Sequence, residues 1–120
     1  MAEIDWTVLE TRFPGKPDFI RRLVAATYEA HADDLAKLAQ IEAARDFAAL
    51  AQLAHKLKGI CGNLAAARLA ALAAETEAAA RAGDAAAFAR LPALAQHIET
   101  FLEELRAHLA PSPLQSEKKT

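Results

Sequence analysis

Apolar residues recur at alternating steps of three and four along four long stretches of the chain. The clearest stripe lies between residues 46 and 64 and consists of Phe47, Leu50, Ala54, Leu57, Cys61 and Leu64, widened by Leu53 and Ile60. Residues 17–44, 66–82 and 91–109 carry the same spacing. Since this spacing places the apolar side chains on one face of an α-helix, each stretch is predicted to be a helix with one buried face.

Helix start and stop residues lie between these stretches. Pro17 suits the first position of a helix, and Asp46 suits the cap before the next one. Gly83 followed by Asp84 predicts a helix end and a new N-cap. Pro92 leaves two alternatives: a short helix at 85–90 precedes the main one, with Pro92 in its first turn, or a single helix kinks at Pro92.

Residues 4–12 predict a short helix that ends at Phe13-Pro14-Gly15 and covers one end of the bundle. The chain shows no strand-like alternation and no glycine-rich phosphate loop. The predicted fold is therefore all-α: an antiparallel up-down four-helix bundle with a short N-terminal capping helix. Residues 1–110 form one domain, and residues 111–120, which contain two prolines and no periodicity, are predicted to be a disordered tail.

Composition excludes several classes of protein. The chain has 120 residues and a formal net charge of −2, without a basic stripe for nucleic acid. No apolar run approaches the roughly 20 residues of a membrane-spanning helix, and the acidic N-terminus does not resemble a secretory signal. One cysteine cannot form an internal disulfide. We expect a monomer without membrane contact in the cytoplasm, although a domain of a membrane-anchored parent has the same composition.

His55 is set apart from the apolar stripe of residues 46–64. At about 100° of rotation per residue it points roughly 150° away from the middle of the stripe, so its imidazole should face outward. The residues predicted to share this face are Ala48, Ala51, Gln52, Lys58, Gly59 and Gly62. Mostly small side chains thus surround one nucleophile, with a cation beside it.

Gly59 and Gly62 each cost the helix about 1 kcal/mol relative to alanine, so a compensating role is expected. One explanation is that another helix of the bundle packs closely on the glycines. The other is that they let a partner's surface approach His55, while Lys58 neutralises an anion placed on the imidazole. The pattern alone leaves both open.

The segment His55-Lys56-Leu57-Lys58-Gly59 resembles the H-x-L-K-G signature of histidine-containing phosphotransfer (HPt) domains, four-helix modules that relay phosphoryl groups in bacterial phosphorelays. The similarity runs from about Asp5 to Leu109. It includes Leu35-x-x-Leu38 with Asp46 before the signature, then Asn63-Leu64-Ala65-Ala66-x-x-Leu69 and Glu77-x-x-Ala80-Arg81-x-Gly83-Asp84 after it. The departures are Ile60 in place of a small residue, Ala65 in place of glycine and Thr76 in place of leucine; they concern packing and docking and do not involve the nucleophile.

The resemblance implies that His55 takes a phosphoryl group from an aspartyl phosphate on one receiver domain and passes it to the aspartate of another. Lys58 would neutralise phosphate charge. The residues expected to contact the receiver are Gln52, Lys56, Gly59, Gly62, Ala48 and Ala51. The receiver brings Mg²⁺, so no cofactor is expected on this chain.

The chain has no nucleotide-binding motif, so the resemblance implies a phosphocarrier without ATP-dependent kinase activity of its own. Such a domain occurs at the C-terminus of hybrid sensor histidine kinases or as a separate protein. The competing hypothesis is a helical module that docks a receiver or another signalling partner without carrying phosphate.

Structural roles are predicted for the remaining chemically active residues. His31 lies on an apolar stripe and is expected to be a partly buried core histidine with one hydrogen bond, and Cys61 is expected to be a buried, unreactive thiol. The residues expected on solvated faces are His97, His108, Glu75, Glu77, Glu103 and Glu104. No metal-ligand spacing is present among the histidines and the cysteine.

Overall fold

The computed structural model describes residues 2–110, which form seven helices and no strand. The helices are α1 (Trp6–Arg12), α2 (Pro17–His31), α3 (Asp34–Ala44), α4 (Phe47–Asn63), α5 (Ala67–Arg81), α6 (Ala86–Ala89) and α7 (Leu91–Leu109). The all-α class is confirmed. The tail predicted at 111–120 lies outside the described residues.

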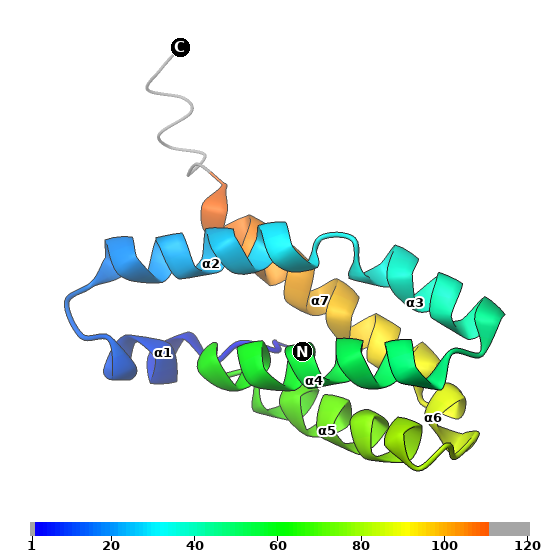
Figure 1. Cartoon of the computed structure of the whole chain (residues 1–120). Coiled ribbons are helices and arrows are strands. Elements are labelled where there is room, and N and C mark those ends of the chain that lie inside the picture. Colours follow the sequence, from blue (N-terminus) through cyan, green and yellow to red (C-terminus); the bar gives the residue numbers. More distant parts are fainter. Residues whose placement is uncertain (1, 111–120) are drawn as a thin grey trace.

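The long helices form an antiparallel bundle (Figure 1). Helices α2 and α3 run one after the other in the same direction, α4 runs back, α5 lies beside α4, and α7 crosses diagonally between these layers. Packing follows this order: α4 pairs with α5, α2 pairs with α7, and both α3 and α5 also contact α7. Helices α2 and α3 together take the place of one long helix of the bundle, and α4, α5 and α7 are the other three. The predicted four-helix up-down architecture is therefore confirmed.

The single helix predicted for residues 17–44 is wrong, because it breaks between His31 and Asp34. Asp33 leaves helical geometry, with φ −97° and ψ 6°, and α3 restarts behind it. Aspartate is a weak helix former, although the Asp33 side chain makes no capping hydrogen bond to α3. The apolar stripe keeps its spacing across the break, with Val24, His31 and Leu38 all buried, so periodicity alone did not reveal it.

Three helices end in the same motif, in which a residue with positive φ follows the last helical turn. These residues are Arg45 (φ 52°), Ala65 (φ 57°) and Gly83 (φ 66°). In each case the next amide reaches back to close the turn: Asp46 N to Ile41 O, Ala66 N to Cys61 O and Asp84 N to Ala79 O. The stop predicted at Gly83 is confirmed. Ala65 thus has a left-handed backbone conformation that glycine adopts without strain. This explains why glycine suits the position at which the sequence has Ala65 instead.

The start of α7 decides between the two alternatives for Pro92. A separate short helix, α6, precedes α7, and Pro92 lies in the first turn of α7. The Asp84 carboxylate accepts a hydrogen bond from the amide of Ala86 and so supports the turn before α6. The kinked-helix alternative is excluded.

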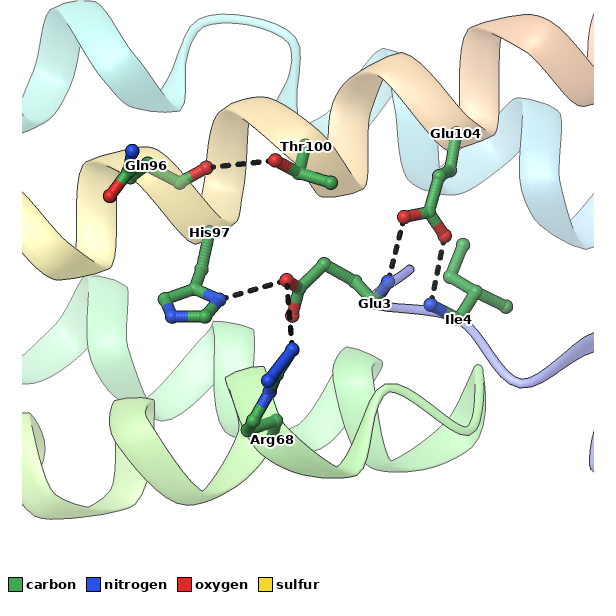
Figure 2. A network of polar contacts seen from close by, with 7 residues as sticks. All are labelled: Glu3, Ile4, Arg68, Gln96, His97, Thr100 and Glu104. Atoms are coloured by element: carbon green, nitrogen blue, oxygen red, sulfur yellow. Dashed lines mark hydrogen bonds and ion pairs between the residues drawn. The ribbon is translucent and has the colours of Figure 1, made fainter. Parts of the chain in front are cut away.

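The N-terminal segment is held inside the bundle by side chains of α7 (Figure 2). The Glu104 carboxylate accepts the amides of Glu3 and Ile4 at 2.7 and 2.9 Å. The buried Glu3 carboxylate lies 2.8 Å from Nδ1 of His97, with Arg68 of α5 on the same oxygen at 3.9 Å. His97 and Glu104 were expected on solvated faces; this expectation is wrong because both serve as anchors for the segment.

Helix α1 caps the bundle as predicted, at the end where α4 stops. Arg12 donates to the carbonyl oxygens of Gly62 and Asn63, and Leu9 is fully buried. The ring of Trp6 stacks on His108 with centroids 4.5 Å apart. His108 is exposed, as expected, and partial burial together with the nearby Arg21 guanidinium lowers its pKa.

Candidate functional site

The rotation of α4 is fixed by its capping residue and its buried stripe. The Asp46 carboxylate accepts the amide of Ala49 at 3.0 Å, which starts the helix. Leu50, Leu57 and Cys61 are fully buried on the inner face. With that face turned inward, the side chain of His55 is 60% exposed. The predicted outward direction of His55 is confirmed.

The ring of His55 makes a hydrogen bond to a carboxylate of α5. Nδ1 of His55 lies 3.0 Å from Oε2 of Glu77. The Glu77 side chain is only 9% exposed. Oε2 also accepts from Arg81, one turn along α5, and Oε1 lies 3.0 Å from the ammonium of Lys58. The expectation that Glu77 belongs to a solvated face is therefore wrong, whereas Glu75 is exposed and pairs with Arg90 at the surface.

The charges around Glu77 keep it ionised. Hydrogen bonds from Lys58, then Arg81, and a weaker one from His55 lower the pKa of Glu77 from 4.5 to about 2, against the opposing effect of burial. An ionised carboxylate can only accept hydrogen bonds, so Nδ1 of His55 must donate. In the neutral imidazole the proton then lies on Nδ1, and Nε2 carries the free electron pair.

Nε2 of His55 is available to a reactant. It has no hydrogen-bond partner within residues 2–110. Lys58 and Arg81 supply two positive charges against the single negative charge of Glu77, so one positive charge is in excess beside the imidazole. An exposed nucleophilic nitrogen with excess cationic charge suits an electrophile that carries negative charge, such as a phosphoryl group.

The surface next to His55 is open. Gly59 and Gly62 are exposed, and a Cβ atom built on either would meet nothing within 4 Å. The explanation that another helix of the bundle packs on these glycines is therefore excluded for the described residues. Gln52, Lys56 and Ala48 are exposed as predicted.

Ala51 differs from its neighbours on the predicted face, because it is only 5% exposed. It lies in an open hollow between α4 and α5 whose lining also includes Ala48, Gln52, Ala80 and Arg81. The expectation that Ala51 shares the exposed face is corrected: α5 covers it.

The remaining candidates fall into structural roles. His31 is buried and makes one hydrogen bond, to Asp34, as predicted. Cys61 is fully buried, and burial, followed by the charges of Glu3 and Asp34, raises its pKa to about 12. Within residues 2–110 no group of three or more His, Cys, Asp or Glu side chains is arranged to hold a metal ion, and no helix is long and apolar enough to cross a membrane.

Sequence reasoning missed the roles of Glu77 and Arg81. The available signal was their i, i+4 spacing, which lets an acid and a base pair on one helix face. Helix α5 is rich in alanine, so its buried and exposed faces differ little in polarity. The spacing of apolar residues therefore does not show that Glu77 is buried.

Comparison with known proteins gave one finding. Residues 22–108 match the family model of the Hpt domain, which covers more than half of the chain, including α3, α4 and α5 and the His55 site between them. Neither the curated proteins nor the solved structures gave a match.

Proposed function

The chain belongs to the Hpt domain family, whose members carry phosphoryl groups on a histidine in phosphorelays, and on that premise we propose that His55 is its phosphoacceptor. The observation that carries the proposal is the hydrogen bond from Nδ1 of His55 to Glu77, which places the proton of the neutral imidazole on Nδ1 and leaves the electron pair of Nε2 for the phosphoryl group. The donor is an aspartyl phosphate of a receiver domain, and the acceptor in the next step is the aspartate of another receiver.

The transfer balances without a further reactant. The Nε2 electron pair attacks phosphorus, the bond from phosphorus to the aspartyl oxygen breaks, and the carboxylate leaves with that electron pair. The imidazole keeps its Nδ1 proton and therefore gains a positive charge, which the ionised Glu77 beside it offsets. Attack by the next aspartate on phosphorus reverses these changes.

Lys58 and Arg81 stabilise the phosphoryl group. Both cations form ion pairs with the Glu77 carboxylate, which also binds Nδ1 of His55. Nε2 of His55 therefore stays free for the phosphoryl group. When the dianionic phosphoryl group arrives, Lys58 can move from Oε1 of Glu77 to a phosphoryl oxygen by turning its flexible side chain. We assign Mg²⁺ to the receiver, which brings it to the shared site.

The docking face consists of Ala48, Gln52, Lys56, Gly59 and Gly62 around His55, with Ala51 in the adjoining hollow. The small residues let the receiver's surface approach within reach of Nε2. We propose that the chain works as a monomeric phosphocarrier in the cytoplasm, either separately or as the phosphotransfer domain of a membrane-anchored hybrid sensor kinase.

The test is incubation of the chain with a receiver domain that has been phosphorylated on its aspartate. We expect phosphate to appear on the chain as an acid-labile, base-stable adduct, and His55→Gln to abolish it while the helical circular dichroism spectrum stays unchanged. Phosphate uptake by His55→Gln at the wild-type level would exclude His55 as the acceptor. Binding of the receiver without any transfer would instead support the docking module that carries no phosphate.

A further inference from the structure

A second histidine is held in the same way as His55, and the proposed function leaves it unused. Nδ1 of His31, at the end of α2, lies 2.6 Å from Oδ2 of Asp34, at the start of α3. The two side chains are 10% and 1% exposed. Within residues 2–110 Nε2 of His31 has no hydrogen-bond partner, yet it is not sealed from solvent. One polar atom of a nearly buried side chain is therefore open to a ligand.

The His31 side chain borders a cavity. His31 and Asp34 line a space of about 400 Å³ between the end of α2, α3 and α4. Because Nδ1 is engaged by Asp34, Nε2 is the ring nitrogen of His31 that remains for a ligand in this cavity. The other lining residues whose side chains carry the argument are Lys37, Gln40, Ile41, Gln52, Leu53 and Lys56. A volume of this size, with apolar walls and a few polar groups, is typical of a site for a small molecule.

The charges of the lining select the kind of ligand. Asp34 is the one acidic residue in the lining, and its Oδ2 is engaged by His31. Lys37 and Lys56 are exposed at the mouth of the cavity and leave it with net positive charge. In its imidazolium form His31 donates from Nδ1 to Asp34 and can donate from Nε2 to an oxyanion, and the Asp34 carboxylate offsets the charge of the ring. Ile41 and Leu53 offer apolar surface to the rest of the molecule.

We propose that this cavity binds a small organic anion, a carboxylate or a phosphate monoester, with its oxyanion on Nε2 of His31, Lys37 and Lys56 and its apolar part against Ile41 and Leu53. Gln52 and Lys56 belong to both the cavity and the docking face, on either side of His55 in α4. The bound anion therefore competes with the receiver and lowers the rate of transfer. This second consequence rests on the proposed function, whereas binding itself does not.

The binding test is a nuclear magnetic resonance titration of the full chain with sodium phosphate, sodium butyrate or sodium chloride at equal ionic strength. We expect phosphate or butyrate, but not chloride, to shift the resonances of His31, Lys37, Gln52 and Lys56. A larger response to phosphate assigns the phosphate class, and a larger response to butyrate assigns the carboxylate class. His31→Gln and Lys37→Ala should each weaken binding about tenfold, while Lys16→Ala, at the other end of α2, should leave it unchanged.

Three results would overturn the site: equal shifts with chloride, shifts confined to Lys58 and Arg81, or wild-type affinity in both His31→Gln and Lys37→Ala. Lys37 is exposed, so its variant keeps the test valid if His31→Gln fails to fold. For regulation, the anion at a concentration near its wild-type Kd should slow phosphoryl transfer to the wild type clearly more than transfer to Lys37→Ala, whose sites stay mostly empty at that concentration. Binding without this inhibition would refute competition with the receiver. A chain that binds the anion but never takes up phosphate would refute only the proposed function.

Discussion

His55 and Lys58 bind different oxygens of one carboxylate: Nδ1 of His55 lies 3.0 Å from Oε2 of Glu77, and Nζ of Lys58 lies 3.0 Å from Oε1. The two residues stand one turn apart on α4, and Glu77 reaches them from α5. The Glu77 carboxylate thus orients the imidazole of His55 and at the same time holds the ammonium group of Lys58 beside it. The position of the His55 ring relative to the Lys58 ammonium group therefore depends on Glu77, a residue that was expected on a solvated face.

Glu77→Gln should slow phosphoryl uptake about tenfold or more, because an amide no longer requires a proton on Nδ1 and does not offset the charge of the phosphorylated ring. We expect ¹⁵N spectra of the His55 ring to change from one neutral tautomer to a mixture. Glu75→Gln, two residues away at an exposed position, is the matched control and should behave as wild type. An unchanged tautomer together with an unchanged rate in Glu77→Gln would show that Glu77 has no positioning role.

The stability that Glu77 contributes should depend on pH in the acid range. Its pKa is lowered from 4.5 to about 2, so the folded state prefers the ionised form, and this contribution is fully present above pH 4.5. It should be lost as the pH falls through about 2, where the folded form also takes up the proton. Thermal melts of wild type and Glu77→Gln should therefore differ most above pH 5 and converge towards pH 2. A constant difference between the two melts over this range would contradict the assignment.

Gly59→Gln should separate docking from folding. A Cβ at Gly59 meets nothing within 4 Å, so the change should leave the free energy of unfolding the same or raise it by up to about 1 kcal/mol through helix propensity. Transfer should slow sharply, because the longer side chain stands where the receiver approaches. Ala26→Gln, at an exposed position of α2, is the control for an added glutamine and should transfer normally. A loss of 1 kcal/mol or more in Gly59→Gln would mean that another part of the chain packs there.

Ala65→Gly tests the strain at the end of α4. Ala65 has φ 57°, a conformation that costs alanine about 1–2 kcal/mol, so relief of strain should offset the lost methyl group and leave stability equal or higher. Ala66→Gly is the matched change at the next position, where φ is −100° and the side chain is fully buried. It should destabilise by about 1–2 kcal/mol. Chemical denaturation of both variants measures the difference, and equal losses would show that Ala65 is not strained.

The parts of the fold that could be predicted are those where polarity alternates strongly along a helix. On α7 the stripe of Leu94, Ile98, Phe101 and Leu105 is fully buried, as predicted. The break before Asp34 was not predictable from periodicity, because the stripe continues in phase on both sides of it. At the break the backbone of Asp33 leaves helical geometry without a side-chain cap, and the Asp34 carboxylate binds His31; a hydrophobic pattern records neither feature.

The site could be predicted as far as α4 alone determines it. The direction of His55 and the openness at Gly59 follow from one helix and its buried face. The contact with Glu77 is tertiary: it depends on how α5 lies against α4, and an alanine-rich helix carries little information about its own rotation. The anchoring of Glu3 by His97 is of the same kind, because it joins positions 94 residues apart.

The N-terminal segment has a consequence for the order of folding. The amide of Glu3 binds Glu104 across 101 positions of the chain, whereas α4 and α5 are neighbours in sequence and form a local hairpin. Closing so long a loop costs entropy that contacts between adjacent helices do not have to overcome. The segment should therefore dock last and open first. Hydrogen exchange in the native state would show this as faster exchange at the amides of Glu3, Ile4 and Asp5 than in the middle of α4, well before the bundle itself unfolds.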